Sequence, residues 1–277
     1  MRRFRTGWDL TKKSWRLLRE QPGLSTFPVA GGLLAFVPTA LIAGPGLYLL
    51  DTGNEVVGAI LVAVGLYLAS VAATYFSVAL AAAADRAFRG EQVTMSDGLA
   101  VANQRFGAIA GWAFVSTVVG ALMSILQSQR GLAGPLIAAL GGAAWGLVTF
   151  LAVPVIAIEG TGPIATIRRS ASLFRERWRG QVMGNIAIGG LVGLLGILPG
   201  ILMVIAGIAL WIDDANGGEV ALGAVLVFAG VVLFTVSAVV SQALRQLFGV
   251  ALYRYTADGQ AVGGFTEAEL QSAVRTR

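Results

Sequence analysis

The sequence predicts an all-α, polytopic membrane protein with six transmembrane helices paired into three hairpins. Two observations give this fold class. Hydrophobic residues make up 56% of the 277 residues and charged residues only 13%, which is far from the balance of a soluble domain. In addition, six runs contain no charged residue, and each is long enough for the roughly 20 apolar residues that a spanning helix needs. The runs are residues 24–50, 56–84, 106–129, 131–158, 181–212 and 220–244, within a single membrane domain of residues 1–277.

The distribution of basic residues predicts how these helices are oriented. All but one of the 20 Lys and Arg residues lie before the first run, in the connections 85–105 and 159–180, or after the sixth run. The remaining connections hold no basic residue except Arg130. Because basic connections stay on the cytoplasmic side, we expect a protein of the cytoplasmic membrane with both termini in the cytoplasm.

Both ends of the chain are predicted to carry helices on the cytoplasmic face. In residues 1–22, apolar and aromatic side chains recur at spacings of three and four between basic residues, as in helices that lie in the membrane interface. That apolar face comprises Phe4, Trp8, Thr11, Trp15 and Leu18. We expect Trp8 and Trp15 to contact lipid. In the tail 254–277, Thr266 opens a capping-box pattern, which predicts a short helix.

Prolines interrupt two of the runs. Pro28, Pro38 and Pro45 lie in the first run and Pro154 in the fourth, and each removes a backbone hydrogen bond that a neighbouring helix or water has to replace. Two interpretations remain open, namely shape-fitting within the bundle and the irregular wall of a substrate cavity. The hydroxyl-bearing residues inside the spans are open to the same two interpretations. Their hydroxyls either bond to nearby backbone within the packed bundle or line a substrate path.

The connection 159–180 predicts a second interfacial helix. Pro163 suits a first helical turn, and apolar residues from Ile164 to Trp178 recur at helical spacing. Glu159, which ends the fourth run, is predicted to form a structural salt bridge with this basic helix. The candidates for contact with lipid headgroups are Arg168, Arg169, Arg175, Trp178 and Arg179.

Small residues in the fifth run recur on one face. They are Gly189, Gly193, Gly196 and Gly200, with Pro199 between the last two. Such a face allows close approach of two backbones. It serves either packing within the chain or a subunit interface, and the proline forms either a static kink or a hinge.

Two pairs of similar segments suggest an internal repeat. Residues 12–20 share a basic pair, Ser, Leu, Arg and Glu with residues 168–176, and residues 76–80 align with 248–252. A repeat would make the three hairpins copies of one unit. Apolar sequences also match by chance, so the alternative of no repeat stays open.

Composition excludes several classes of function. The chain has no His and no Cys, so it lacks disulfides, reactive thiols and the commonest metal ligand, and its spans hold no acids for intramembrane catalysis. We therefore expect no catalytic residue, no metal and no cofactor, and a protein that is not an enzyme. The net charge of +5 comes from basic residues beside helix ends, which anionic headgroups attract. Membrane lipids, rather than nucleic acid, are the expected partners.

Residues 154–163, followed by 167–170 and 174–178, together with the region 8–15, resemble an uncharacterised prokaryotic family of six-helix integral membrane proteins, a domain of unknown function. A proline, an acid and a glycine that lead into a basic helix are more distantly similar to the membrane domain attached to some glycerophosphodiester phosphodiesterases. The resemblance implies the fold and an association with envelope lipid or protein partners. It implies no catalytic residue, because the family carries no established activity.

From these features we expect a non-enzymatic multi-pass protein that acts in membrane organisation or as an adaptor. Its partners would be membrane lipids with anionic headgroups, a membrane protein, or a second copy of the chain. The alternative is a permease or lipid-handling transporter for an apolar or neutral substrate, because the interior of the spans offers no charge.

Overall fold

Helices and short turns make up the part of the chain that the structure describes. The computed structural model describes residues 23–129, 133–177, 197–212, 217–263 and 266–267. No strand occurs among these residues, so the all-α prediction is confirmed for them. The predicted amphipathic helix over residues 1–22 lies outside the described residues, as does the tail beyond residue 267.

The first hairpin is made of α2 (Gly23–Pro38), the π turn η1 (Thr39–Ala43), α3 (Gly44–Asp51) and α4 (Glu55–Phe88). Pro38 and Pro45 lie on either side of the π turn. Neither can donate the hydrogen bond that a regular helix needs at its position, and the backbone widens between them. The two arms approach closely through glycines, since a Cβ on Gly58 would lie 2.7 Å from the carbonyl oxygen of Gly46.

The second hairpin is made of α6 (Phe106–Gln127), α7 (Ala133–Thr149) and α8 (Ala152–Glu159), and α5 (Met95–Gln104) precedes it. The apolar run 131–158, predicted as one helix, is therefore two helices that are separated at Phe150 and Leu151. Pro154 supplies the physical reason. It lacks the N–H that would bond to the carbonyl of Phe150, and its ring crowds that carbonyl.

The third hairpin is made of α11 (Leu198–Ile212) and α12 (Gly217–Asp258), and α9 (Pro163–Arg177) precedes it. α9 begins at the proline predicted for its first turn. α12 continues well past residue 244, where its apolar run ends, and α4 likewise continues past residue 84, because residues 85–88 and 245–258 contain no proline. Since α5 and α9 each stand before a hairpin, the described chain repeats the order of a short helix followed by a hairpin.

Four helices are long and apolar enough to cross a membrane. They are Thr26–Asp51, which joins α2, η1 and α3, and Glu55–Phe88, Phe106–Gln127 and Val220–Asp258; shorter apolar helices are Ala133–Gly146 and Leu198–Leu210. Large apolar side chains on these arms are exposed, with exposed fractions of 65% for Leu33, 71% for Leu41 and 72% for Phe228. Exposed apolar surface on this scale suits lipid rather than water.

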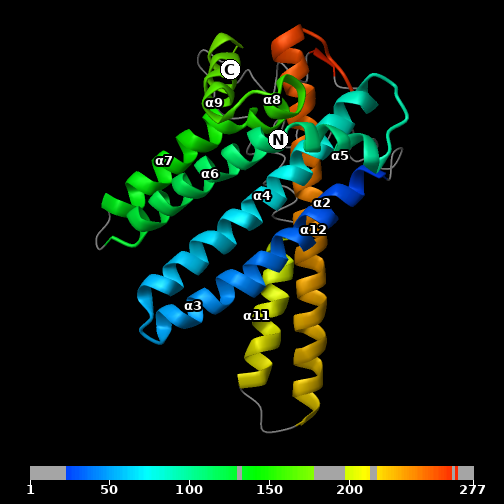
Figure 1. Ribbon diagram of the computed structural model, residues 1–277. Helices are drawn as coiled ribbons and strands as arrows, with labels where there is room; N and C mark the ends of the chain where they lie inside the picture. Colours follow the sequence, from blue (N-terminus) through cyan, green and yellow to red (C-terminus); the bar gives the residue numbers. More distant parts are fainter. Residues whose placement is uncertain (1–22, 130–132, 178–196, 213–216, 264–265, 268–277) are drawn as a thin grey trace.

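The hydrophobic core lies at one end of the molecule. Its buried side chains come from all three hairpins, for example Leu80 of α4, Ile156 of α8 and Leu247 of α12. From this packed end the pairs α3 and α4, α6 and α7, and α11 and α12 diverge as separate arms (Figure 1). The two similar segments, 76–80 and 248–252, both lie in the packed end, so they occupy comparable places in two of the hairpins.

Candidate functional site at the polar end of the bundle

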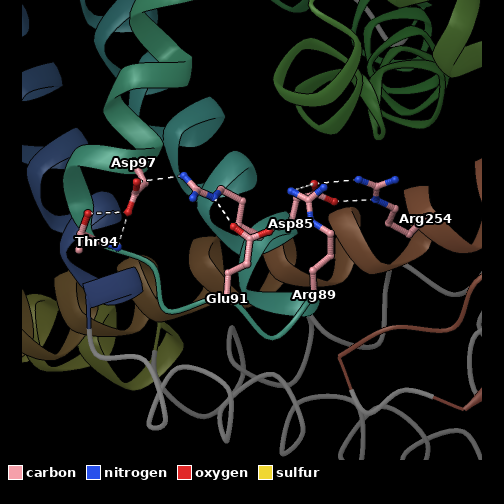
Figure 2. Close-up of polar contacts among 7 residues, drawn as sticks. Asp85, Arg89, Glu91, Thr94, Asp97 and Arg254 are labelled. Carbon is pink, nitrogen blue, oxygen red and sulfur yellow. Dashed lines mark hydrogen bonds and ion pairs between the residues drawn. The ribbon is translucent and has the colours of Figure 1, made fainter.

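Charged side chains gather where the hairpins meet, in residues 85–105, 159–169 and 245–258, which we call the polar end. Arg254 of α12 forms a bidentate ion pair with Asp85 of α4. Its Nε lies 2.6 Å from Asp85 Oδ1 and its Nη2 lies 2.8 Å from Oδ2 (Figure 2). The Asp85 side chain is only 8% exposed, and a carboxylate so shielded needs partners to remain charged. This ion pair therefore ties the third hairpin to the first.

Tyr253, the neighbour of Arg254, contacts the second hairpin instead. Its hydroxyl donates a 2.7 Å hydrogen bond to Glu159 Oε1 at the end of α8, and Arg169 Nε of α9 donates to the same oxygen at 2.7 Å. The predicted salt bridge of Glu159 is present, with Arg169 as its basic partner. The hydrogen bond to Glu159 raises the pKa of Arg169. We call Asp85, Glu159, Arg169, Tyr253 and Arg254 the clasp, because they join all three hairpins.

A second network fixes α5 beside the end of α4. Arg86 Nε lies 2.7 Å from Glu91 Oε2, and Arg86 Nη1 lies 2.9 Å from Asp97 Oδ1 (Figure 2). Asp97 also accepts hydrogen bonds from the N–H and the hydroxyl of Thr94, at 2.9 and 2.6 Å, which closes a capping box at the start of α5. The Thr94 hydroxyl, then its N–H, hold the pKa of Asp97 below its ordinary value.

Three arginines of the polar end have no acidic partner within the described part of the chain. They are Arg105, Arg168 and Arg245. The guanidinium of Arg105 rests on Gly160, the left-handed residue (φ +68°) that ends α8, and a Cβ on this glycine would overlap it. Arg105 Nε is shielded from solvent and has no hydrogen-bond partner among the residues that the structure describes. Among the described residues, positive charge is therefore left over at this end after the internal ion pairs have formed.

The residues predicted to contact lipid have different surroundings in the structure. Arg168 is exposed on α9, whereas Arg169 belongs to the clasp. Trp8, Trp15, Trp178 and Arg179 lie outside the described residues, as does the side chain of Arg175. The face of α9 that packs on the protein includes Ser170, which is 1% exposed, while Ile164 of the predicted apolar stripe is 65% exposed. Ile164, the first residue of that stripe, is therefore accessible for contact with lipid.

The predicted packing residues are described only at Pro199 and Gly200. Gly189, Gly193 and Gly196 lie outside the described residues. A Cβ on Gly200 would lie 2.8 Å from Phe234 N and 3.0 Å from Gly230 O, both on α12. Packing within one hairpin therefore accounts for Gly200. Pro199 is the second residue of α11 as described. Residues 178–196, which precede it in the predicted kinked helix, lie outside the described residues.

The acids of the polar end are engaged in ion pairs with arginines. This holds for Asp85, Glu91, Asp97, Glu159 and Asp258. Within the described residues, no group of three or more His, Cys, Asp or Glu side chains is arranged to hold a metal ion. The geometry thus describes charge pairing between helices and an excess of arginine.

Sequence reasoning predicted Glu159 but missed Asp85 and Arg254, which lie 169 positions apart. No local pattern links residues at that separation. The available signal was the pair of similar segments, 76–80 and 248–252, because each leads into one member of the ion pair.

An all-α fold with four helices able to span a bilayer, apolar arms and charges gathered at one end fits the class of helical membrane proteins. Within that class, the model of the family of unknown function DUF6159 matches residues 56–264, so the chain belongs to this family. No curated protein and no solved structure matches the chain. The likeness to the membrane domain of glycerophosphodiester phosphodiesterases and the prokaryotic origin therefore stay predictions.

Proposed function

We propose that the chain is a non-enzymatic, six-span protein of a prokaryotic cytoplasmic membrane, with both termini in the cytoplasm. In this proposal it binds anionic lipid and a protein partner through its polar end, and so acts in membrane organisation or as an adaptor. The observation that carries the proposal is the difference in ion pairing between acids and arginines at that end. The acids form ion pairs within the clasp and its neighbours, whereas Arg105, Arg168 and Arg245 have no acidic partner among the described residues.

The location of these arginines supports the orientation. They stand where apolar arms give way to polar connections, which is the depth of lipid headgroups if the arms span the bilayer. Each basic residue near an anionic surface contributes about 1 kcal/mol of attraction. An excess of unpaired arginine is therefore suited to holding a cytoplasmic leaflet or an acidic partner segment.

The test is extraction of the chain from its native membrane into polymer nanodiscs, followed by mass spectrometry of the lipids and proteins that co-purify. A variant with Arg168, Arg175 and Arg179 changed to Gln should lose the partner or the anionic lipids. Arg169 is left in place, because it pairs with Glu159 and its loss would perturb the fold. The matched control changes the same three residues to Lys, which keeps the charge. If the Gln variant retains every partner and lipid at the level of the control, the adaptor proposal fails.

A specific observation favours transport as the second candidate. Two of the apolar segments are discontinuous, at the π turn of Thr39–Ala43 and at Phe150 and Leu151, and interrupted helices commonly line transport pathways. In this reading Pro154→Ala, which restores a backbone hydrogen bond, should change the flux of neutral solutes from proteoliposomes. Flux equal to that of protein-free vesicles, with or without the substitution, would remove the transport candidate.

A further inference from the structure

Arg105 is an unusual arginine for its position. It stands between α5 and α6, at the border of a polar connection and an apolar run. Its Nε is shielded from solvent, yet no hydrogen bond or ion pair to any described residue satisfies it. Two other cations of the polar end, Arg169 and Arg254, both bind carboxylates. A partly shielded, unpaired arginine loses hydration, and no hydrogen bond or ion pair compensates for the loss.

The guanidinium of Arg105 is held against the loop that leads from α8 to α9. It lies on Gly160, where only the absence of a Cβ makes room for it. In the same loop the N–H groups of Thr161 and Gly162 donate to no acceptor within the described residues. The loop ends at Pro163, the first residue of α9, and Pro163 packs on α6, since a Cβ on Gly111 would lie 3.2 Å from its ring.

The carboxylate that directly precedes the loop does not neutralise this arginine. Glu159, directly before Gly160, directs Oε1 to Arg169 and Tyr253 at 2.7 Å each. A second cation, Arg168, stands on the first turns of α9 and is exposed. The Arg105 guanidinium, the two N–H groups that bond to no described acceptor and the N-terminus of α9 thus stand beside the same loop. Together they match an oxyanion with several acceptor oxygens.

We infer that Arg105 and the loop 160–162 bind the phosphate of an anionic phospholipid in the cytoplasmic leaflet. The guanidinium fork suits the paired oxygens of a phosphate better than the point charge of a lysine would. Large apolar side chains that follow the site in sequence point to a lipid source, because Phe106 is 52% exposed and Ile164 is 65% exposed, and both can contact acyl chains. The inference deepens the proposed function and rests on the chain lying in the membrane.

The test is native mass spectrometry of the full chain in detergent, titrated with phosphatidylglycerol and, separately, with phosphatidylcholine. The wild-type chain should retain one phosphatidylglycerol in preference to phosphatidylcholine. Arg105→Gln should weaken this binding about tenfold or more, which corresponds to losing charge-assisted hydrogen bonds. Arg105→Lys, which keeps the charge and much of the stem, should weaken it less. The matched control is Arg89→Gln, which removes the same charge from a side chain that is 54% exposed and already pairs with Asp85 and Glu91; it should bind like the wild type.

Two outcomes would overturn the inference. One is an Arg105→Gln variant that binds phosphatidylglycerol like the wild type. The other is an equal loss in Arg89→Gln, which would show attraction to general surface charge. Addition of inorganic phosphate distinguishes the sources, since displacement of the lipid at millimolar phosphate would assign the site to the free anion. Failure here leaves the adaptor proposal standing if the chain still binds anionic vesicles and the variant with Arg168, Arg175 and Arg179 changed to Gln does not.

Discussion

Replacing Asp85 by Asn should destabilise the protein more than any change at an exposed ion pair. Asp85 is 8% exposed and binds Arg254 at 2.6 and 2.8 Å from two different nitrogens. Asn keeps the shape but removes the charge, so Arg254 loses one of its two carboxylates and keeps only Asp258, at 2.7 Å. The substitution therefore separates the value of the ion pair from that of packing.

The expected cost follows from burial. Breaking a fully buried ion pair costs about 3–5 kcal/mol, whereas an exposed pair is worth about 0–1 kcal/mol. Arg254 is 21% exposed and retains Asp258, so the cost should lie below the buried limit, at about 2–4 kcal/mol. Arg254→Gln should cost a similar amount, because it leaves Asp85 shielded with only Arg89 at 3.3 Å.

The assay is a double-mutant cycle, with free energies of unfolding measured in mixed micelles by titration with a denaturing detergent. The coupling energy between Asp85→Asn and Arg254→Gln should be about 1.5–3 kcal/mol, because each single change already removes the same pair. The control cycle uses Arg89 and Glu91, whose side chains are 54% and 39% exposed at 3.3 Å. Its coupling energy should stay below about 1 kcal/mol.

The reasoning is refuted if the two cycles give the same small coupling energy. That result would mean that water reaches the Asp85 carboxylate freely and that the third hairpin is held to the first by apolar contacts alone. A large coupling energy for the exposed pair would refute it too, since exposure would then not determine the strength of these ion pairs.

Three further predictions concern other contacts of the described chain. Gly207→Ala should cost about 1–3 kcal/mol of stability, because a Cβ there would lie 2.6 Å from Gly223 O. Gly32→Ala, where a Cβ would meet no atom within 4 Å, should be neutral or stabilise the protein by up to about 1 kcal/mol. Thermal unfolding of both variants checks the difference in sign. The hydrogen bonds from Thr94 hold the pKa of Asp97 below its ordinary value of 3.8 in the folded state, so its carboxylate stabilises the fold above pH 3.8 and the contribution is lost as the pH falls through the lowered pKa. Asp97→Asn should therefore reduce the melting temperature at neutral pH and have little effect at a pH below that lowered pKa. Glu159→Gln should cost about 1–2 kcal/mol, less than Asp85→Asn, because Arg169 is 40% exposed and water can take over part of the lost interaction; equal costs in chemical denaturation would contradict this ranking.

Much of the fold could be predicted because membrane-spanning helices leave a local signature. The runs 56–84 and 106–129 correspond closely to Glu55–Phe88 and Phe106–Gln127, since apolar length alone defines such a helix. The start of α9 at Pro163 was predictable for a similar reason, as a proline without an N–H fits a first turn. These features depend only on residues that are close together in sequence.

The features that could not be predicted from the sequence depend on tertiary contacts, or on whether a helix continues or breaks at a given residue. Pro154 was recognised as an irregularity, but the pattern did not show that the run 131–158 would separate into two helices. The capping box of Thr94 and Asp97 was not predicted, because it begins a short helix that lies in a polar connection outside the apolar runs. The interaction of Arg105 with Gly160 depends on the meeting of α5, α6 and α8, which no local pattern specifies.

The divergence of the hairpins has a physical cause in the solvent that the arms are expected to meet. Lipid tails are as apolar as leucine, so apolar arms gain little from contact with one another in a bilayer. Polar contacts are different, because a shielded charge such as Asp85 requires a particular partner. Tyr253 and Arg254, adjacent on α12, supply such partners to α8 and α4. The arrangement of the three hairpins is therefore determined chiefly at the polar end, and a partner or lipid bound there would act on all of them together.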